Sequence, residues 1–298
     1  MIAERSASVN CLFGVARTCR LLGRSRSGVY WARTGPIRAS SPAHKRGPKT
    51  AWSDGELLER IRGVLGASPF VGEGHRKVWA RLRAAQVRTS QRRVLRVMRD
   101  ANLLAPTRAR RVIGPRVHDG TITTDKPNVR WGTDATSVWT EDEGVVTVFA
   151  AIDHCTAECV GSHAAKRATR FEALEPIRQG VREHFAGYAA GSAKGLELRH
   201  DHGSQYMSDH FQAEIAFLGI ESSPAFVRAP EGNGCIERFF RTLKEQLLWI
   251  RCFRGAEDVR VAVADWTRVY NEQWLIGRHG HRAPAVRRRE LLALKASA

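Results

Sequence analysis

Three acidic residues in the second half of the chain occupy distinct places in its apolar pattern. Asp134 lies within a segment rich in Val and Thr that reads as a strand, and Asp201 directly follows a short apolar run. Glu237 lies in a segment whose apolar residues recur every three or four positions, which predicts an amphipathic helix. If the two strands are neighbours, the two aspartates meet and the helix covers them. This requirement constrains the fold.

The spacing of these acids resembles that of a known family. Between Asp201 and Glu237 lie 35 residues, and Lys244 follows the glutamate by seven positions. Asp134 stands in the context Trp-x-x-Asp-x-Thr. The pattern resembles the D,D-35-E triad of retroviral-type integrases and insertion-sequence transposases. It is similar above all to the OrfB-type DDE transposases of the insertion-sequence-three family, and the resemblance covers nearly the whole chain.

The resemblance implies that Asp134, Asp201 and Glu237 are catalytic and hold two Mg²⁺ or Mn²⁺ ions. Phosphodiester transfer builds negative charge on the attacking and leaving oxygens, and two cations about 3.5–4 Å apart hold both oxygens in line. Mg²⁺ prefers carboxylate oxygens and retains several waters, so few acids suffice. Without metal, crowded carboxylates repel one another, which raises their pKa values.

The order of predicted elements beyond residue 129 favours an α/β fold. Three strands with short turns come first, and strands then alternate with helices. The expected strands are 130–140, 145–154, 158–163, 195–200 and about 220–223, and the expected helices are 168–187, 208–218 and the segment with Glu237. This order is the one expected of an RNase H-like core of the retroviral integrase type, over residues 130–290.

Positive charge is concentrated before the first acid of the triad. The net charge is +18; residues 1–129 hold 26 Lys and Arg against 8 Asp and Glu, and residues 130–298 hold 22 of each. Neutralising phosphates releases counterions, so a polyanion is the natural partner of such a segment. The distribution therefore favours double-stranded DNA as a partner.

The basic half reads as small all-α segments that precede the core. We expect a helical segment and linker over 1–52, a helix-turn-helix-like domain over 53–116 and a basic connector over 117–129. Ser53 predicts a helix cap, because Glu56 follows it by three positions. The expected DNA contacts of the helix-turn-helix are Arg76, Lys77, Gln91, Arg92, Arg93 and Arg96. A structural hairpin with a solvated basic face is the alternative.

The segment with Glu237 offers further cations. Lys244 lies two helical turns from Glu237 on nearly the same face, which makes it a candidate phosphate contact. Arg238 and Arg241 are expected to face DNA. A solvated surface is the alternative for any single helix lysine.

Four polar residues near the acids need separate interpretations. Asp153 ends the second expected strand, and we expect it to have a structural role or to support the metal ligands. His200 and His202 flank Asp201; hard Mg²⁺ prefers oxygen, so we expect DNA contact or packing. Asn233 is a candidate cap for the helix that carries Glu237.

The six cysteines contain no CxxC pair. Cys155 and Cys159 near His154 would suggest zinc, but no second pair completes a ligand set. Reduced thiols in a cytoplasmic protein are the preferred interpretation. No run of 18 apolar residues and no charged-then-apolar leader is evident, so we expect neither a membrane span nor a signal peptide and place the protein in the bacterial cytoplasm, at the nucleoid.

By resemblance, the protein binds insertion-sequence ends, cleaves a strand to free a 3′-hydroxyl and joins that hydroxyl to another phosphodiester. It is expected to act as a homo-oligomer on DNA, and the OrfA-type product of an upstream frame is a further candidate partner. Two alternatives remain open. One is a DNA-binding regulator or inactive copy that does not cut, and the other is an RNase H-type nuclease that does not join strands.

Overall fold

The protein is described by a computed structural model that covers residues 4–8, 10–34, 51–106, 123–225 and 233–296. The chain forms two compact units, Met1–Thr50 and Ala51–Ala298. The first contains helices α1 (Gly14–Leu21) and α2 (Arg26–Thr34). Residues 35–50 of the expected linker and residues 117–122 of the expected connector lie outside the described residues.

Three helices begin the second unit: α3 (Asp54–Ala67), α4 (His75–Ala84) and α5 (Gln91–Asp100). Ser53 begins α3 with the predicted capping box. Its Oγ accepts a hydrogen bond from the N–H of Glu56 at 3.2 Å, and the glutamate accepts one from the N–H of Ser53 at 2.7 Å. The apolar faces of the three helices share a small core that contains Leu57, Ile61, Val78, Leu82, Val94 and Met98.

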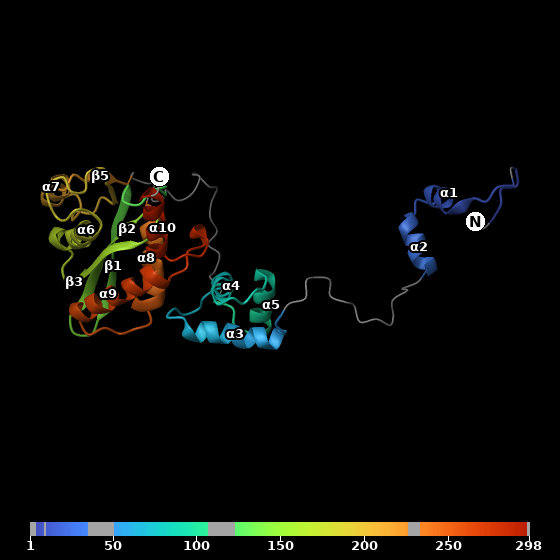
Figure 1. Ribbon diagram of the computed structural model, residues 1–298, viewed down its shortest axis with the longest axis horizontal. Helices are drawn as coiled ribbons and strands as arrows, with labels where there is room; N and C mark the ends of the chain where they lie inside the picture. The colour runs from blue at the N-terminus through green and yellow to red at the C-terminus, as the bar shows by residue number, and fades with distance from the viewer. Residues whose placement is uncertain (1–3, 9, 35–50, 107–122, 226–232, 297–298) are drawn as a thin grey trace. The chain divides into compact units, whose positions relative to one another are not determined.

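A five-stranded mixed sheet forms the centre of the larger domain (Figure 1). Its strands are β1 (Arg130–Thr140), β2 (Gly144–Asp153), β3 (Cys159–Ala165), β4 (Glu197–His200) and β5 (Glu221–Pro224). They stand in the order β3-β2-β1-β4-β5. Consecutive strands β1 to β3 pair antiparallel, whereas β4 is parallel to both β1 and β5. This order confirms the predicted α/β, RNase H-like fold.

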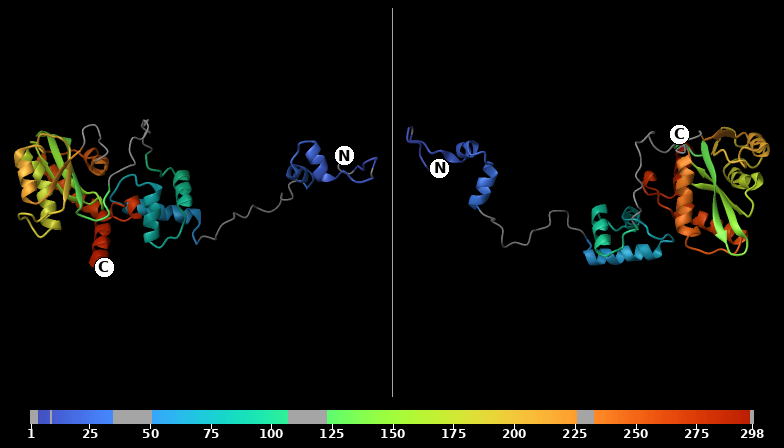
Figure 2. Two further views of the ribbon diagram at one scale, coloured as in Figure 1. Left: turned by 90° about the horizontal axis from the view of Figure 1, so that it is seen from above. Right: turned by 180° about the vertical axis from the view of Figure 1, so that it is seen from behind.

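Helices cover both faces of the sheet, as the views in Figure 2 show. On β2, Val148 and Ala150 pack into one core, and Phe149 and Ala151 into the other, because successive side chains of a strand point to opposite faces. The first core contains residues of α8 (Gly234–Leu243) and α9 (Ala256–Gln273), and the second contains residues of α6 (Arg170–His184) and α7 (Asp209–Phe217). A π-helical turn, Lys244–Leu248, continues α8, and α10 (Pro284–Ala296) ends the described chain.

The segment between α3 and α4 packs against the larger domain. Phe70 belongs to the core that contains α8 and α9, and its ring meets Trp274 edge-on with the centroids 4.8 Å apart. The side chain of Gln246 forms two hydrogen bonds with the backbone of Val71, of 2.8 and 2.9 Å. The Nζ of Lys77 lies 2.8 Å from the centroid of the Trp274 ring. The helix-turn-helix-like helices are thereby joined to the π-helical turn and to the end of α9.

The contact between α6 and β3 leaves no room for a side chain at Gly161. A Cβ there would lie 2.1 Å from the carbonyl oxygen of Pro176 in α6. We expect Gly161→Ala to lower the free energy of unfolding by about 1–3 kcal/mol or more, because backbone rather than a flexible side chain must move. Urea unfolding of the full chain measures this change.

The matched control is Gly63→Ala. Gly63 is exposed in the middle of α3, and a Cβ there would meet no atom within 4 Å. Alanine is the better helix former by up to about 1 kcal/mol, so this variant should be unchanged or more stable. Equal midpoints for the Gly161 variant and the parent protein would contradict the packing described above.

Candidate active site

The parallel pairing of β1 with β4 brings two of the predicted acids together. Gly132 of β1 is aligned with Arg199 of β4. Because the strands run in the same direction, continuing this register by two positions would bring Asp134 level with Asp201, and the charge of Asp201 does act on Asp134. Neighbouring strands lie about 4.8 Å apart, and aligned residues point to the same face. Asp201 directly follows the end of β4 at His200, so the aligned acids lie where β4 gives way to a turn.

The third acid faces the same region from the helix layer. Glu237 lies in the first turn of α8 and is exposed. It lines a pocket of about 310 Å³ together with Asp134 and Lys244. The other residues of this pocket, called here the acid pocket, are Ala135, Thr136, Phe240, Arg241 and Trp249.

The electrostatics of Asp134 reflect this crowding. The pKa of its carboxyl is raised to about 6, chiefly by burial and in smaller part by the charges of Asp201 and Glu237. Two groups act in the opposite direction: the N–H of Ala135, which donates to Oδ1 at 2.8 Å, and the charge of Lys244. Asp134 therefore carries negative charge that its surroundings compensate only in part, which favours the binding of a cation.

The acids supply the right donors but not a closed set of ligands. In the described part of the chain, no three side chains of His, Cys, Asp or Glu stand close enough together to hold a metal ion. Asp201 is exposed, and its Oδ1 accepts a hydrogen bond from the N–H of Gly203 at 2.8 Å. All three acids offer carboxylate oxygens, which Mg²⁺ and Mn²⁺ prefer. The residues present fit a hard divalent cation, provided that the side chains converge when it binds.

Asn233 connects the start of α8 to β1. It occupies the N-cap position, but its side chain makes no capping hydrogen bond, so the predicted cap is wrong. Its Nδ2 instead donates to the carbonyl of Thr133 at 3.3 Å. The reason is proximity: a Cβ on Gly132 would lie 2.8 Å from the Oδ1 of Asn233. The helix that carries Glu237 is thus attached to the strand that carries Asp134.

Two polar residues beside the triad have structural partners. Asp153 is fully buried, accepts hydrogen bonds from the N–H groups of Asn128 and Thr156, and lies 3.5 Å from Arg288. His200 is buried as well. Its ring nitrogens lie 2.7 Å from the carbonyl oxygen of Asp201 and 2.9 Å from the Oγ of Ser222, and burial lowers its pKa. His200 therefore packs beneath the turn that holds Asp201.

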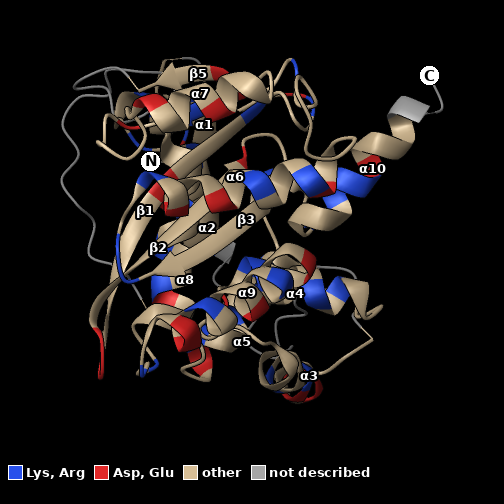
Figure 3. Ribbon diagram, turned by 90° about the vertical axis from the view of Figure 1, so that its left-hand side faces the viewer, with Lys and Arg blue, Asp and Glu red and all other residues tan. Residues whose placement is uncertain are grey.

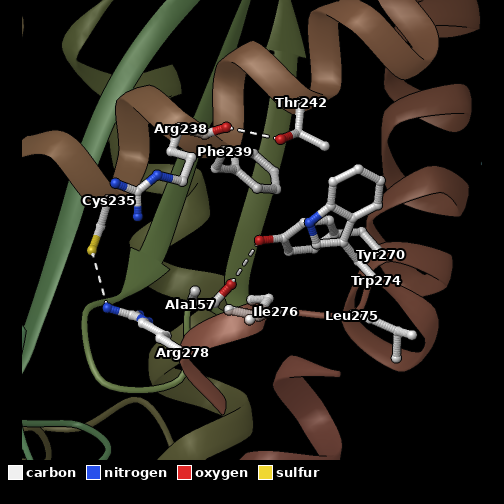
Figure 4. Close-up of a pocket in the computed structure, with 11 residues that line it drawn as sticks. Ala157, Cys235, Arg238, Phe239, Thr242, Tyr270, Trp274, Leu275, Ile276 and Arg278 are labelled. Carbon is white, nitrogen blue, oxygen red and sulfur yellow. Dashed lines mark hydrogen bonds between the residues drawn. The ribbon is translucent and has the colours of Figure 1, made fainter. Parts of the chain in front are cut away.

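The cations predicted on the Glu237 helix point in different directions. Lys244 and Arg241 line the acid pocket, where Arg241 also forms a 3.3 Å ion pair with Glu245. Arg238 is exposed and lines a second pocket of about 240 Å³, shown in Figure 4. The guanidinium of Arg278 closes one side of that pocket and donates to the carbonyls of His154 and Cys155. Three aromatic residues also line it: Phe239, Tyr270 and Trp274.

Several cations predicted on α4 and α5 have partners within the protein. Arg93 and Arg96 both pair with Asp54 at 2.8 Å, which joins α5 to the start of α3. Lys77 packs over Trp274, and burial lowers its pKa to about 7. Arg76 and Arg92 are exposed, and Gln91 is half-buried at the start of α5. Figure 3 shows that basic residues recur on α4 and on α10.

Three residues at the site did not emerge from the sequence in these roles. The bond from Asn233 to Thr133 spans 100 positions, and the bonds from Gln246 to Val71 span 175. No local pattern predicts such pairs. Trp249 lines the acid pocket although it is 68% exposed. A large apolar residue directly after an amphipathic helix was the available signal.

Comparison with known proteins finds two matching families and similar transposases. The family described as Integrase core domain matches residues 218–284, and the family described as HTH-like domain matches residues 53–111. Transposase InsD for insertion element IS2A/D/F/H/I/K of Escherichia coli is 27% identical over 236 residues, which are 78% of this chain and 77% of that protein. The chain therefore carries regions similar to an integrase core domain and an HTH-like domain, and it is similar to an insertion-element transposase. Its enzyme class is that of the polynucleotidyl transferases, and integrase cores are metal-dependent.

Solved structures of integrases also align with the chain. The catalytic core domain of BIV integrase aligns with a TM-score of 0.43 and 19% identity, over 57% of this chain and 99% of that one. The HTLV-2 integrase catalytic core domain in complex with magnesium aligns with a TM-score of 0.40 and 17% identity, over 53% of this chain and 94% of that one. Within the described residues, no helix is both long and apolar enough to span a bilayer.

Replacement of Asp134 by Asn should stabilise the metal-free protein in a pH-dependent manner. The pKa of Asp134 is about 6 in the folded protein against 3.8 for the ordinary carboxyl. Between these values the folded protein keeps a proton that the unfolded chain loses, so stability falls as pH rises through this window. Above pH 6 the charged carboxylate of Asp134 lowers the stability of the folded protein to the full extent, and Asp134→Asn removes this loss.

We expect Asp134→Asn to raise the free energy of unfolding by about 1–2 kcal/mol at pH 8 and to leave it nearly unchanged near pH 3.5. Urea unfolding with EDTA at both pH values measures the difference. Asp142→Asn, in the exposed turn between β1 and β2, is the matched control. A gain for the Asp134 variant of the same size at both pH values would contradict a raised pKa.

Proposed function

We propose that this protein binds the ends of an insertion sequence and catalyses metal-dependent cleavage and transfer of DNA strands. The observation that carries the proposal is that Asp134 lines one pocket with Glu237 of α8 and lies close enough to Asp201, just beyond the paired part of β4, for the two charges to interact. A pocket lined by acidic and basic side chains suits a phosphodiester, because the acidic side chains can bind a metal ion and the basic side chains can bind the phosphate.

Each residue of the site has a distinct part in this proposal. Asp134, Asp201 and Glu237 would hold two Mg²⁺ or Mn²⁺ ions. Bound there, the ions would activate the attacking oxygen and offset charge on the leaving oxygen. Lys244 shares the acid pocket with two of the acids and would bind a phosphate of the substrate strand. Asn233 keeps Glu237 beside β1.

The remaining partners follow from the basic half of the chain. The domain over 53–116 would bind double-stranded DNA through Arg76, Gln91 and Arg92, with Arg238 and Arg241 adding contacts near the site. Lys77, Arg93 and Arg96 would first have to leave their partners within the protein in order to reach DNA. We further propose a homo-oligomer on DNA, assisted by the OrfA-type product of an upstream frame, at the nucleoid of a bacterial cell.

Glu237→Gln should abolish strand cleavage and joining. The amide keeps the shape of the side chain but loses the charge that holds a cation. Removal of a residue that only supports a metal ligand lowers activity about 10–100-fold. Loss of the charge of Glu237 itself should lower activity by more than this. The assay uses the full chain, labelled duplexes from the DNA that flanks its gene, and Mg²⁺, Mn²⁺ or EDTA. Glu245→Gln, two turns along the same helix and paired with Arg241, is the matched control.

The products separate the competing functions. Metal-dependent nicking and a joined strand, both lost in Glu237→Gln and kept in Glu245→Gln, support the transposase. Nicking without joining would indicate a nuclease. DNA binding without cleavage, even after addition of the upstream-frame product, would indicate a regulator or an inactive copy.

A further inference from the structure

A tryptophan lies at the rim of the acid pocket with most of its surface in solvent. Trp249 is 68% exposed, and it lines the pocket together with Asp134, Glu237 and Lys244. Exposing so large an apolar ring to water forfeits the gain of burying it. Its position beside charged groups suggests a ligand that covers the ring.

The π-helical turn puts Trp249 at this position. In a regular α-helix, the residue 11 positions after Glu237 would share its face. That residue is Leu248, but it is buried, with 5% of its surface exposed. The N–H of Trp249 donates to the carbonyl of Lys244, five positions back, at 2.9 Å. The wider turn holds an additional residue, so Leu248 turns into the core and Trp249 takes the place on the acid pocket.

The neighbours of Trp249 decide which ligand suits it. Arg241 and Lys244 line the same pocket, so the ring stands beside two cations. An aromatic face next to cations matches a nucleotide: the cations take the phosphate, and the base lies on the ring, with any base sequence tolerated. An apolar protein surface would offer neither cation a negatively charged group. The surroundings therefore favour DNA over a second copy of the chain.

We propose that Trp249 stacks on a base of the DNA strand next to the phosphodiester that the acids attack. Stacking would fix the position of that phosphodiester relative to Asp134 and Glu237. Trp249 is thus a positioning residue for the substrate. This inference rests on the proposed function, because it assumes that the acid pocket receives DNA.

The first test detects the stack without catalysis. Flanking-DNA duplexes carry one 2-aminopurine at successive positions and bind the Glu237→Gln chain, in which cleavage is blocked. At one position, fluorescence should be quenched in the parent and with Trp249→Phe, but not with Trp249→Ala. Trp139→Ala is the matched control, because Trp139 is 72% exposed at the far end of β1 and does not line the acid pocket. It should quench like the parent.

The second test measures cleavage by the chain with its glutamate intact. Trp249→Ala should lower cleavage of the normal duplex about 5–100-fold, which corresponds to the loss of one stacked base. Removal of the base at the position where 2-aminopurine is quenched should lower cleavage by the parent protein by a similar factor. The two changes together should cost little more than either alone, because both remove the same contact. Unfolding midpoints should match, since the ring is exposed.

Three outcomes would overturn the inference. The first is quenching that persists at every position with Trp249→Ala, and the second is a loss of cleavage in the double change equal to the product of the two single losses. The third is a smaller assembly of Trp249→Ala in sedimentation, which would assign Trp249 to contact between copies of the chain. Failure of the proposed function looks different. In that case the parent binds and quenches 2-aminopurine through Trp249 but does not cut, and the stacking inference stands alone.

Discussion

The parallel pairing of β1 with β4 is the constraint on which the site depends. The pairing fixes Gly132 opposite Arg199, and Asp134 and Asp201 lie two positions further along their segments, close enough for the charge of Asp201 to raise the pKa of Asp134. A shift by one residue would turn one of the two acids to the opposite face of the sheet, because side chains alternate along a strand. The apolar cores on both faces of the sheet prevent such a shift, since Trp131 and Leu198 are fully buried in the same one.

The second requirement is that α8 approach β1 closely enough for Glu237 to face Asp134. Three features of the sequence meet it: the absence of a side chain at Gly132, the amide of Asn233 on the Thr133 carbonyl, and the burial of Phe239 and Phe240 in the core. The π-helical turn that follows then serves two purposes. It presents Trp249 at the acid pocket, and through Gln246 it holds the backbone of Val71. The helix-turn-helix-like helices are thereby attached to the helix of the third acid.

Local patterns sufficed for much of this description. A run rich in Val and Thr predicts β2, and the Ser53–Glu56 pair predicts the start of α3, because both depend on residues close together in the sequence. The triad was predicted from its spacing and family resemblance. In the structure Asp134 shares a pocket with Glu237, and the charge of Asp201 acts on it. Contacts between residues far apart in the sequence were not predicted. Arg93 and Arg96 look like DNA contacts on an amphipathic helix, yet Asp54, about 40 positions earlier, pairs with both. The periodicity of apolar residues also does not reveal the π-helical turn, because the same spacing runs on from the α-helix into that turn.

The most direct measurement of the central claim is anomalous diffraction from crystals of the protein soaked in Mn²⁺. The account predicts a peak bound by carboxylate oxygens of both Asp134 and Asp201, at distances of about 2.1 Å, and a second peak near Glu237 once DNA is present. Anomalous peaks that lie only elsewhere on the protein, with the two aspartates turned apart at saturating Mn²⁺, would contradict it.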